Sequence, residues 1–261
     1  MFSWSYKFVS DMKKSPFLFL LLVFHFGNLS AAELHIAVAA NFATSMRDIA
    51  KEYEKKSAHK VKLSSGSSGK LYAQIKHGAP FDLFFAADTL RPQLLEQQGI
   101  AVAGSRFTYA IGQLILWSPQ VGFVDARGEV LKGDGFHHLA IANPKLAPYG
   151  DAASAVLQHL GIWNTLRGRM VRGENIAQTF QFVQSGNAEL GFVALSQLTK
   201  ADGLIAGSYW LIPEKLYTPI EQQAVILSNK PAATEFMAFI QSREMRSLIQ
   251  SHGYKNRVDK D

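Results

Sequence analysis

The chain has 261 residues, a formal net charge of +6 and no cysteine, and 48% of its residues are hydrophobic. A chain without cysteine can form neither a disulfide nor a thiolate metal site. The basic excess raises the local concentration of anions, but it is not gathered into a basic arm. We therefore expect no nucleic acid among the partners.

The first 32 residues have the pattern of a secretory signal peptide. Three lysines precede an apolar run over residues 16–26, and small residues follow at positions 30–32. The apolar run is shorter than the ~20 residues that a membrane-spanning helix needs. We predict cleavage after Ala32, or alternatively after Ala31, and a mature chain in a bacterial periplasm.

Beyond this segment, strand-like apolar stretches alternate with amphipathic helical ones. The predicted strands cover residues 34–39, 61–63, 82–86, 114–117, 139–142, 169–172, 190–194, 204–211 and 224–227. Such alternation predicts an α/β fold with parallel sheets that helices cover on both faces. Ligands of open α/β sheets bind at the carboxyl ends of the strands.

The elements form two groups, one before about residue 110 and one after it, and the final helices are expected to return to the first. This organisation predicts two lobes with a ligand cleft between them. Residues 33–110 together with 221–261 form the first predicted lobe, and residues 111–220 form the second.

The stretch 63–71 reads Leu-Ser-Ser-Gly-Ser-Ser-Gly-Lys-Leu, and it joins a predicted strand to a predicted helix. A helix that begins in such a turn leaves several backbone N–H groups without partners and directs the positive end of its dipole at one point. That point binds an anion without any charged side chain. For this turn alone, serines that only cap a helix are the commoner arrangement.

Three further turns of the same kind favour an anion site. Asn41 follows the first strand and offers a side-chain amide and a helix-start N–H, while Ser68 offers a hydroxyl and its own N–H. At Tyr149, in a predicted loop over residues 143–150, and at Ile176, the backbone N–H matters more. Asn175 lies where the N-cap of the following helix is expected.

Other chemistries lack their motifs. The stretch 64–71 departs from a phosphate-binding P-loop because Ser64 replaces the first glycine and Leu71 replaces the hydroxyl residue that would hold Mg²⁺. No Gly-x-Ser-x-Gly elbow for a nucleophilic serine is present. We therefore do not expect an enzyme.

The chain resembles the periplasmic molybdate-binding proteins of ABC importers. The stretches that carry the resemblance are residues 39–41, 66–71, 78–88, 148–150, 174–176 and 190–193. The most specific of them is the stretch 78–88, which reads Gly-Ala-Pro-Phe-Asp-Leu-Phe-Phe-Ala-Ala-Asp. This resemblance implies a type II periplasmic binding fold, in which two α/β lobes are joined by crossover strands. It also implies a tetrahedral molybdate or tungstate ion held by hydrogen bonds alone.

Carried over from the family, the ligand positions fall on Asn41, Ser68, Tyr149 and the N–H of Ile176. These groups would contact the oxygens of the ion and not the metal. Many relatives have serine in the first turn, although a subgroup with asparagine is more similar to this chain. Some relatives also have a ligand tyrosine where this chain has Ala194, so the Tyr149 phenol is a candidate to replace that hydroxyl.

The resemblance thus predicts capture of molybdate, and of tungstate, in the periplasm and delivery to an inner-membrane ABC permease, by a monomer without a cofactor. An ion with two charges and no proton needs hydrogen-bond donors only, which is what the four turns supply. Two alternatives stay open: a sulfate or thiosulfate receptor, and an exported enzyme that uses the same cleft. The lack of a placed base or nucleophile argues against the enzyme.

Overall fold

The computed structural model describes residues 31–199 and 205–256. The predicted signal peptide therefore lies outside the described residues, apart from Ala31 and Ala32, and so does the beginning of the strand predicted over residues 204–211. Within the described residues, no helix is both long and apolar enough to span a membrane.

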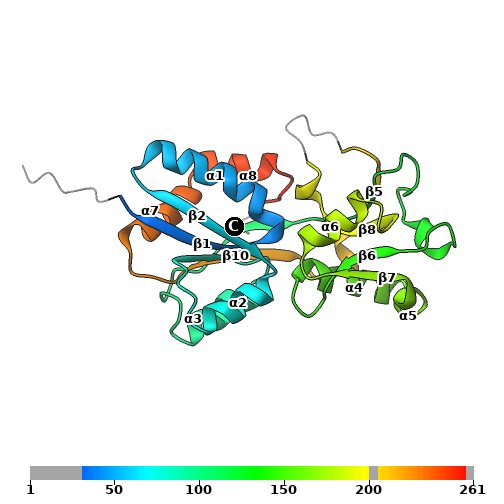
Figure 1. Cartoon of the computed structure of the whole chain (residues 1–261), viewed down its shortest axis with the longest axis horizontal. Coiled ribbons are helices and arrows are strands. Elements are labelled where there is room, and N and C mark those ends of the chain that lie inside the picture. The colour runs from blue at the N-terminus through cyan, green and yellow to red at the C-terminus, as the bar shows by residue number, and fades with distance from the viewer. Residues whose placement is uncertain (1–30, 200–204, 257–261) are drawn as a thin grey trace, which may run out of the picture. The chain divides into compact units, whose positions relative to one another are not determined.

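The described chain forms two five-stranded sheets (Figure 1). The first sheet has the strand order β2-β1-β3-β10-β4, with bounds β1 (Glu33–Ala39), β2 (Lys60–Gly66), β3 (Leu83–Phe85), β4 (Phe107–Gly112) and β10 (Ile220–Ile226). The second has the order β7-β6-β8-β5-β9, with bounds β5 (Leu114–Ser118), β6 (Leu139–Ala142), β7 (Met170–Gly173), β8 (Leu190–Ala194) and β9 (Ser208–Leu211). The predicted two-lobed α/β fold class is confirmed.

The prediction of parallel sheets is right for only part of each sheet. Strand β1 pairs in parallel with β2 and β3, and β6 pairs in parallel with β7 and β8. Strand β10 is antiparallel to β3 and β4, and β5 is antiparallel to β8 and β9. Strands β5 and β10 each follow a passage from the other sheet without an intervening α-helix, so the rule that helical connections produce parallel pairs does not apply to them.

Helices cover both faces of the first sheet (Figure 1). Their bounds are α1 (Ala43–Lys56), α2 (Ser68–Lys76), α3 (Leu90–Gln97), α7 (Pro231–Ile240) and α8 (Arg243–Ser251). Since successive side chains of a strand point to opposite faces, Ile36 and Val38 of β1 pack with α1, α7 and α8, whereas Ala37 between them packs with α2 and α3. Both faces are therefore buried, as the continuous apolar sequence of β1 predicts.

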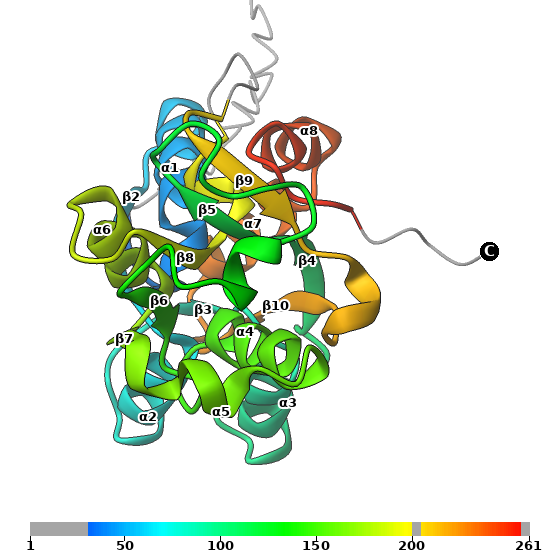
Figure 2. The same cartoon turned by 90° about the vertical axis from the view of Figure 1, so that its right-hand side faces the viewer.

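The second sheet is covered in the same way (Figure 2). Its helices are α4 (Pro148–His159), α5 (Trp163–Leu166) and α6 (Ile176–Gln184). Leu116 and Phe192 pack with α4 on one face, whereas Ile115 and Val193 pack with α6 on the other. Short 3₁₀ helices complete the described chain: η1 (Ala40–Phe42), η2 (Glu129–Lys132), η3 (Arg167–Arg169), η4 (Leu195–Gln197) and η5 (Glu214–Leu216).

The chain passes between the sheets twice, once from β4 to β5 through Gln113 and once from β9 to β10 through residues 212–219. The end of the described chain lies against the first of these connections. Ile111 and Lys255 exchange two backbone hydrogen bonds, of 2.8 and 3.0 Å, and the Gln113 side chain donates to the carbonyl oxygen of Gly253. The segment after α8 therefore belongs to the framework of the connection.

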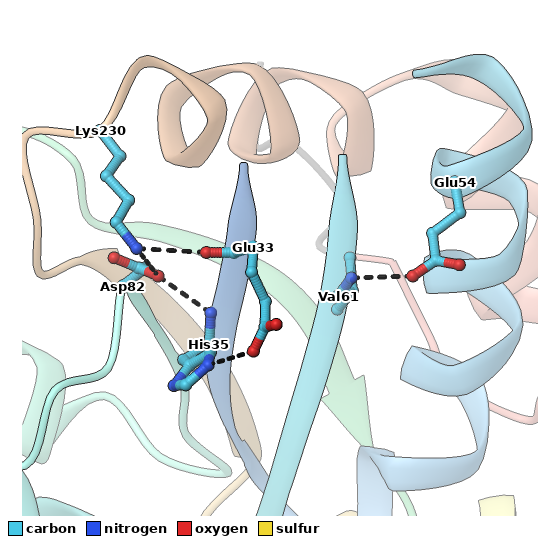
Figure 3. A network of polar contacts seen from close by, with 6 residues as sticks. All are labelled: Glu33, His35, Glu54, Val61, Asp82 and Lys230. Carbon is cyan, nitrogen blue, oxygen red and sulfur yellow. Dashed lines mark hydrogen bonds and ion pairs between the residues drawn. The ribbon is translucent and has the colours of Figure 1, made fainter. Parts of the chain in front are cut away.

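A buried carboxylate ties the amino ends of the first sheet together (Figure 3). Asp82 accepts hydrogen bonds from the His35 backbone N–H and from the Lys230 ammonium group, each at 2.9 Å. The same ammonium group donates to the carbonyl oxygen of Glu33 at 3.1 Å. Burial would raise the pKa of Asp82, but these hydrogen bonds outweigh it and hold the pKa below its ordinary value.

We expect Asp82→Asn to destabilise the protein by about 1.5–3 kcal/mol at neutral pH, the usual contribution of a hydrogen bond to a charged group. A carboxyl group whose pKa is lowered by folding stabilises the native state above its unfolded pKa, and this contribution is lost as the pH falls. Urea unfolding at pH 7 and pH 3 measures the effect. The difference between wild type and variant should shrink at pH 3, and an equal difference at both pH values would contradict this account.

Candidate functional site

One small hollow is lined by the turns that the sequence singles out. About 190 Å³ of it is not filled by atoms, a space that includes part of the open solvent at its mouth, and its lining residues are Ala39, Ala40, Asn41, Gly66, Ser67, Ser68, Ala87, Ala147, Pro148, Tyr149, Asn175 and Ile176. The four predicted ligand residues are all among them, two from each side of the molecule. Other hollows are larger, but none of those found in the described chain gathers these four helix beginnings.

Each of the four predicted residues is the first or second residue of a helix. Ser68 opens α2, Ile176 opens α6, Tyr149 is the second residue of α4, and Asn41 is the second residue of η1. The backbone N–H groups at these positions have no acceptor within their own helices. Across residues 31–199 and 205–256, none of the four N–H groups has an acceptor elsewhere either. The hollow is therefore surrounded by free backbone donors.

The position of Tyr149 in a helix corrects one expectation. The sequence predicts a loop over residues 143–150, but α4 already begins at Pro148. Proline is favoured at the first helical position because its fixed φ suits the helix and its missing N–H would be unpaired there in any case. The first N–H that α4 directs at the hollow is therefore that of Tyr149.

Ser68 contributes a hydroxyl as well as an N–H. Its Oγ accepts a hydrogen bond from the Ala87 N–H at 2.9 Å, and its side chain is almost completely buried. Since this bond uses a lone pair of the oxygen, the hydroxyl hydrogen stays available to donate. The preceding Ser67 is the N-cap, because its side chain accepts from the Lys70 N–H.

The Asn41 side-chain amide, predicted to donate to the anion, donates instead to buried residues of the protein. Its Nδ2 donates to the Gln222 Oε1 at 2.8 Å and to the Tyr254 hydroxyl at 3.1 Å, which uses both amide hydrogens. The backbone carbonyl oxygen of Asn41 accepts from the Tyr254 hydroxyl at 2.8 Å and from the Ser196 hydroxyl at 3.2 Å. A buried amide must satisfy its donors, and here it does so inside the protein. The group of Asn41 left for an anion is its backbone N–H.

The Tyr149 phenol also points to the interior. Its hydroxyl accepts from the Gln222 Nε2 at 3.3 Å, and it lies so close to Gly112 that a Cβ on that residue would be 2.1 Å away. Gly112 ends β4, where the chain passes to the second sheet. The hydroxyl is therefore held at this connection, and we do not assign it the position that a tyrosine after β8 has in some relatives.

At the fourth turn, the prediction that Asn175 is an N-cap is confirmed. Its Oδ1 accepts from the N–H groups of Ala177 and Gln178 at 3.0 and 3.1 Å. The Ile176 N–H, one position earlier, has no acceptor within residues 31–199 and 205–256. Gln197 also contacts this helix start, because its Nε2 donates to the backbone carbonyl oxygen of Ile176 at 3.1 Å.

No ionisable side chain other than Tyr149 is found among the described residues that line the hollow. Burial raises the pKa of Tyr149 well above its ordinary value, so the phenol is neutral at physiological pH. Within the described residues there is also no group of three or more His, Cys, Asp or Glu side chains that could hold a metal ion. The hollow is uncharged and offers donors, which suits an anion that carries no proton.

The two sides of the hollow contact each other directly. The Gly69 N–H of α2 donates to the carbonyl oxygen of Leu146, just before α4, at 2.9 Å. Lys70 forms an ion pair with Glu174 at 3.3 Å, between α2 and the turn before α6. Both of these side chains are more than half exposed, so the ion pair contributes little energy, and the backbone hydrogen bond is the tighter constraint.

The sequence does not predict the buried residues that hydrogen-bond to these turns on the side away from the hollow. Gln222 and Tyr254 contact Asn41 from 181 and 213 positions away in the sequence. No local pattern marks them, because a polar side chain in a strand and a tyrosine near the end of the chain are both ordinary. Only the folded arrangement identifies them.

The chain matches known proteins over almost all of its described length. The model of the family described as "Bacterial extracellular solute-binding protein" matches residues 34–255. The molybdate-binding protein ModA of Azotobacter vinelandii is 51% identical over 227 residues, 86% of this chain and 90% of the relative. The ModA protein of Rhodobacter capsulatus is 44% identical over 228 residues, 86% of this chain and 89% of the relative.

A solved structure agrees with these matches. The periplasmic molybdate-binding protein of Azotobacter vinelandii superposes with a TM-score of 0.84 at 44% identity, covering 85% of this chain and 99% of that one. The family match and the two relatives above 40% identity show the same relationship. The chain therefore belongs to the family of bacterial extracellular solute-binding proteins.

Proposed function

We propose that this protein captures molybdate and delivers it to an ABC permease. The ion would be bound by the backbone N–H groups of Asn41, Ser68, Tyr149 and Ile176, together with the Ser68 hydroxyl. The observation that carries the proposal is a set of four helix-start N–H groups, without acceptors in the described part of the chain, around a hollow whose described lining is uncharged. The names of the relatives, both molybdate-binding proteins, support the choice of ion.

The chemistry of the hollow favours a proton-free dianion. Molybdate and tungstate carry two charges and no proton at neutral pH, so each of their oxygens accepts hydrogen bonds. A phosphate site would include a carboxylate to accept the proton of the ligand, and the lining residues include none. Sulfate has the same charge and shape as molybdate and is the competing ligand, so the size of the closed hollow must distinguish the two ions.

We further propose that residues 33–110 with 221–261 move as one lobe, and residues 111–220 as the other, when the ion enters and leaves. The protein would act as a periplasmic monomer after removal of the signal peptide over residues 1–32. It performs no chemistry on the ion, in keeping with a family of solute-binding proteins. The ion is cargo, and no cofactor is required.

A thermal-shift panel of oxyanions on the mature protein tests the proposal. A ligand that binds only the folded state adds about 2.7 kcal/mol at 100 times its Kd. For a chain of this size, that raises the Tm by about 5–10 °C. We expect such a shift with molybdate and tungstate and none with phosphate. A shift with sulfate alone, or with none of the four ions, would overturn the proposal.

The variant Ser68→Ala tests whether the ion binds in the hollow. Loss of one charge-assisted hydrogen bond should weaken molybdate binding about tenfold or more, and isothermal titration calorimetry measures this. Ser154→Ala is the matched control, because that hydroxyl is also buried but donates to the carbonyl oxygen of Asp151 away from the hollow. Equal affinities for the two variants would mean that the ion binds elsewhere.

A further inference from the structure

A cluster of buried polar side chains lies behind the hollow, and we call it the hinge cluster. Its members are Asn41, Tyr109, Tyr149, Ser196, Gln222 and Tyr254, and each is less than a tenth exposed. They come from both sides of the hollow. Tyr109 and Gln222 lie on β4 and β10 of the first sheet, whereas Tyr149 lies on α4, which packs against the second sheet, and Ser196 lies on η4, which follows β8 of that sheet. The cluster therefore joins the two sides of the proposed site where the chain passes between them.

Gln222 lies at the centre of the hinge cluster. Its Oε1 accepts from the Asn41 Nδ2 at 2.8 Å and from the Tyr109 hydroxyl at 2.9 Å, and its Nε2 donates to the Tyr149 hydroxyl at 3.3 Å. The pairing of β10 with β4 shifts register between Gln222 and Gln223, so a bulge fixes the strand at this point. One fully buried amide thus contacts a proposed ion-binding residue on each side.

The connection between the sheets is shaped to receive the Tyr149 phenol. A Cβ on Gly112 would lie 2.1 Å from the Tyr149 hydroxyl and 2.6 Å from the Gln222 Nε2. Only glycine leaves this space, and the need comes from the close approach of the neighbours and not from an unusual φ. The Tyr149 hydroxyl, from a helix of the second sheet, therefore packs against Gly112 and Gln222 on the strands of the first sheet.

We propose that Gln222 is a positioning residue that couples closure of the two lobes to ion binding, an inference that rests on the proposed function. Its carbonyl oxygen fixes Asn41, so that the N–H of the η1 turn faces the hollow. Its amide nitrogen holds the Tyr149 phenol, and with it the start of α4, only while the second lobe is closed onto the first. Opening would leave buried polar groups unpaired, which costs free energy and therefore retains the ion.

This role predicts an effect on release of the ion. Gln222→Met keeps the length of the side chain but removes its hydrogen bonds, and Tyr149→Phe removes only the hydroxyl. We expect each variant to raise the dissociation rate of molybdate about five- to tenfold, as the loss of one buried hydrogen bond would, with little change in the association rate. Stopped-flow fluorescence of the mature protein measures both rates.

Two comparisons separate positioning from a general structural role. Because Gln222 and Tyr149 act through one bond, the double variant should be no worse than the more affected single variant. Gln223→Met is the matched control, because this neighbouring buried glutamine accepts from Arg106 and donates to Thr108, away from the hollow. Its molybdate kinetics should equal those of the wild type, even if its Tm without ligand falls.

The results distinguish failure of this inference from failure of the proposed function. If the wild type does not bind molybdate, the proposed function is wrong. If the wild type binds and Gln222→Met releases the ion at the wild-type rate, only the coupling is wrong. Additive effects in the double variant would also overturn the coupling. Should Gln222→Met fail to fold, the rates of Tyr149→Phe decide the question alone.

Discussion

Replacement of Ile176 by proline is expected to weaken molybdate binding about 10- to 100-fold, because it removes one N–H donor to a charged ligand. The substitution suits the backbone. Ile176 is the first residue of α6, where proline is favoured, and the preceding Asn175 has φ −146° and ψ 173°, in the extended region that a residue before proline adopts. The helix should therefore form while the proposed donor is absent.

Ile176→Val is the matched control, because it keeps the N–H and most of the buried side chain. Calorimetric titration with molybdate gives the affinities, and urea unfolding without ligand gives the stabilities of both variants. We expect similar stabilities and very different affinities. Equal molybdate affinities for the proline and valine variants would remove the Ile176 N–H from the site.

Gly69→Val is the second substitution with a large expected effect, because it separates the two sides of the hollow. A Cβ on Gly69 would lie 3.0 Å from the carbonyl oxygen of Leu146 and 3.1 Å from its Cα, and these are backbone atoms that cannot turn aside. The hydrogen bond from Gly69 to Leu146 would be lengthened or broken. We expect molybdate affinity to fall by more than tenfold, since the donors of α2 and α4 could no longer reach one ion together.

The smaller variant Gly69→Ala makes this test more specific. Alanine favours a helix over glycine by up to about 1 kcal/mol, and this gain offsets the cost of the 3.0 Å contact with Leu146, so the stability of the ligand-free protein should change little. The molybdate affinity of this variant should nevertheless fall, so the substitution should weaken binding without destabilising the fold. Gly168→Ala is the control, because a Cβ there meets no atom within 4 Å. Small-angle scattering with molybdate should detect incomplete closure only in the Gly69 variants.

The features that the sequence predicts well are those with a local signal. Alternation of apolar strands and amphipathic helices predicts the two-lobed α/β class, and cap residues such as Asn175 mark where helices begin. Since the proposed ligands are helix-start N–H groups, a pattern that locates helix starts also locates candidate donors. This is why the sequence selects Ser68 and Ile176, and why the hollow gathers all four candidates.

The features that the sequence predicts poorly depend on residues that are far apart along the chain. The direction of β10 and β5 within their sheets follows from how the chain passes between the sheets, which no segment of sequence records. The orientation of the Asn41 amide depends on Gln222 and Tyr254, each more than 180 positions away. From its residue type alone, the Asn41 amide is expected to donate hydrogen bonds to the ion, whereas both of its N–H groups donate to these buried partners.

The two hydrogen bonds between Tyr254 and Asn41 bridge 213 positions in the sequence. Tyr254 lies near the end of the described chain, so the η1 turn can take its final place only after almost all of the described chain has been synthesised.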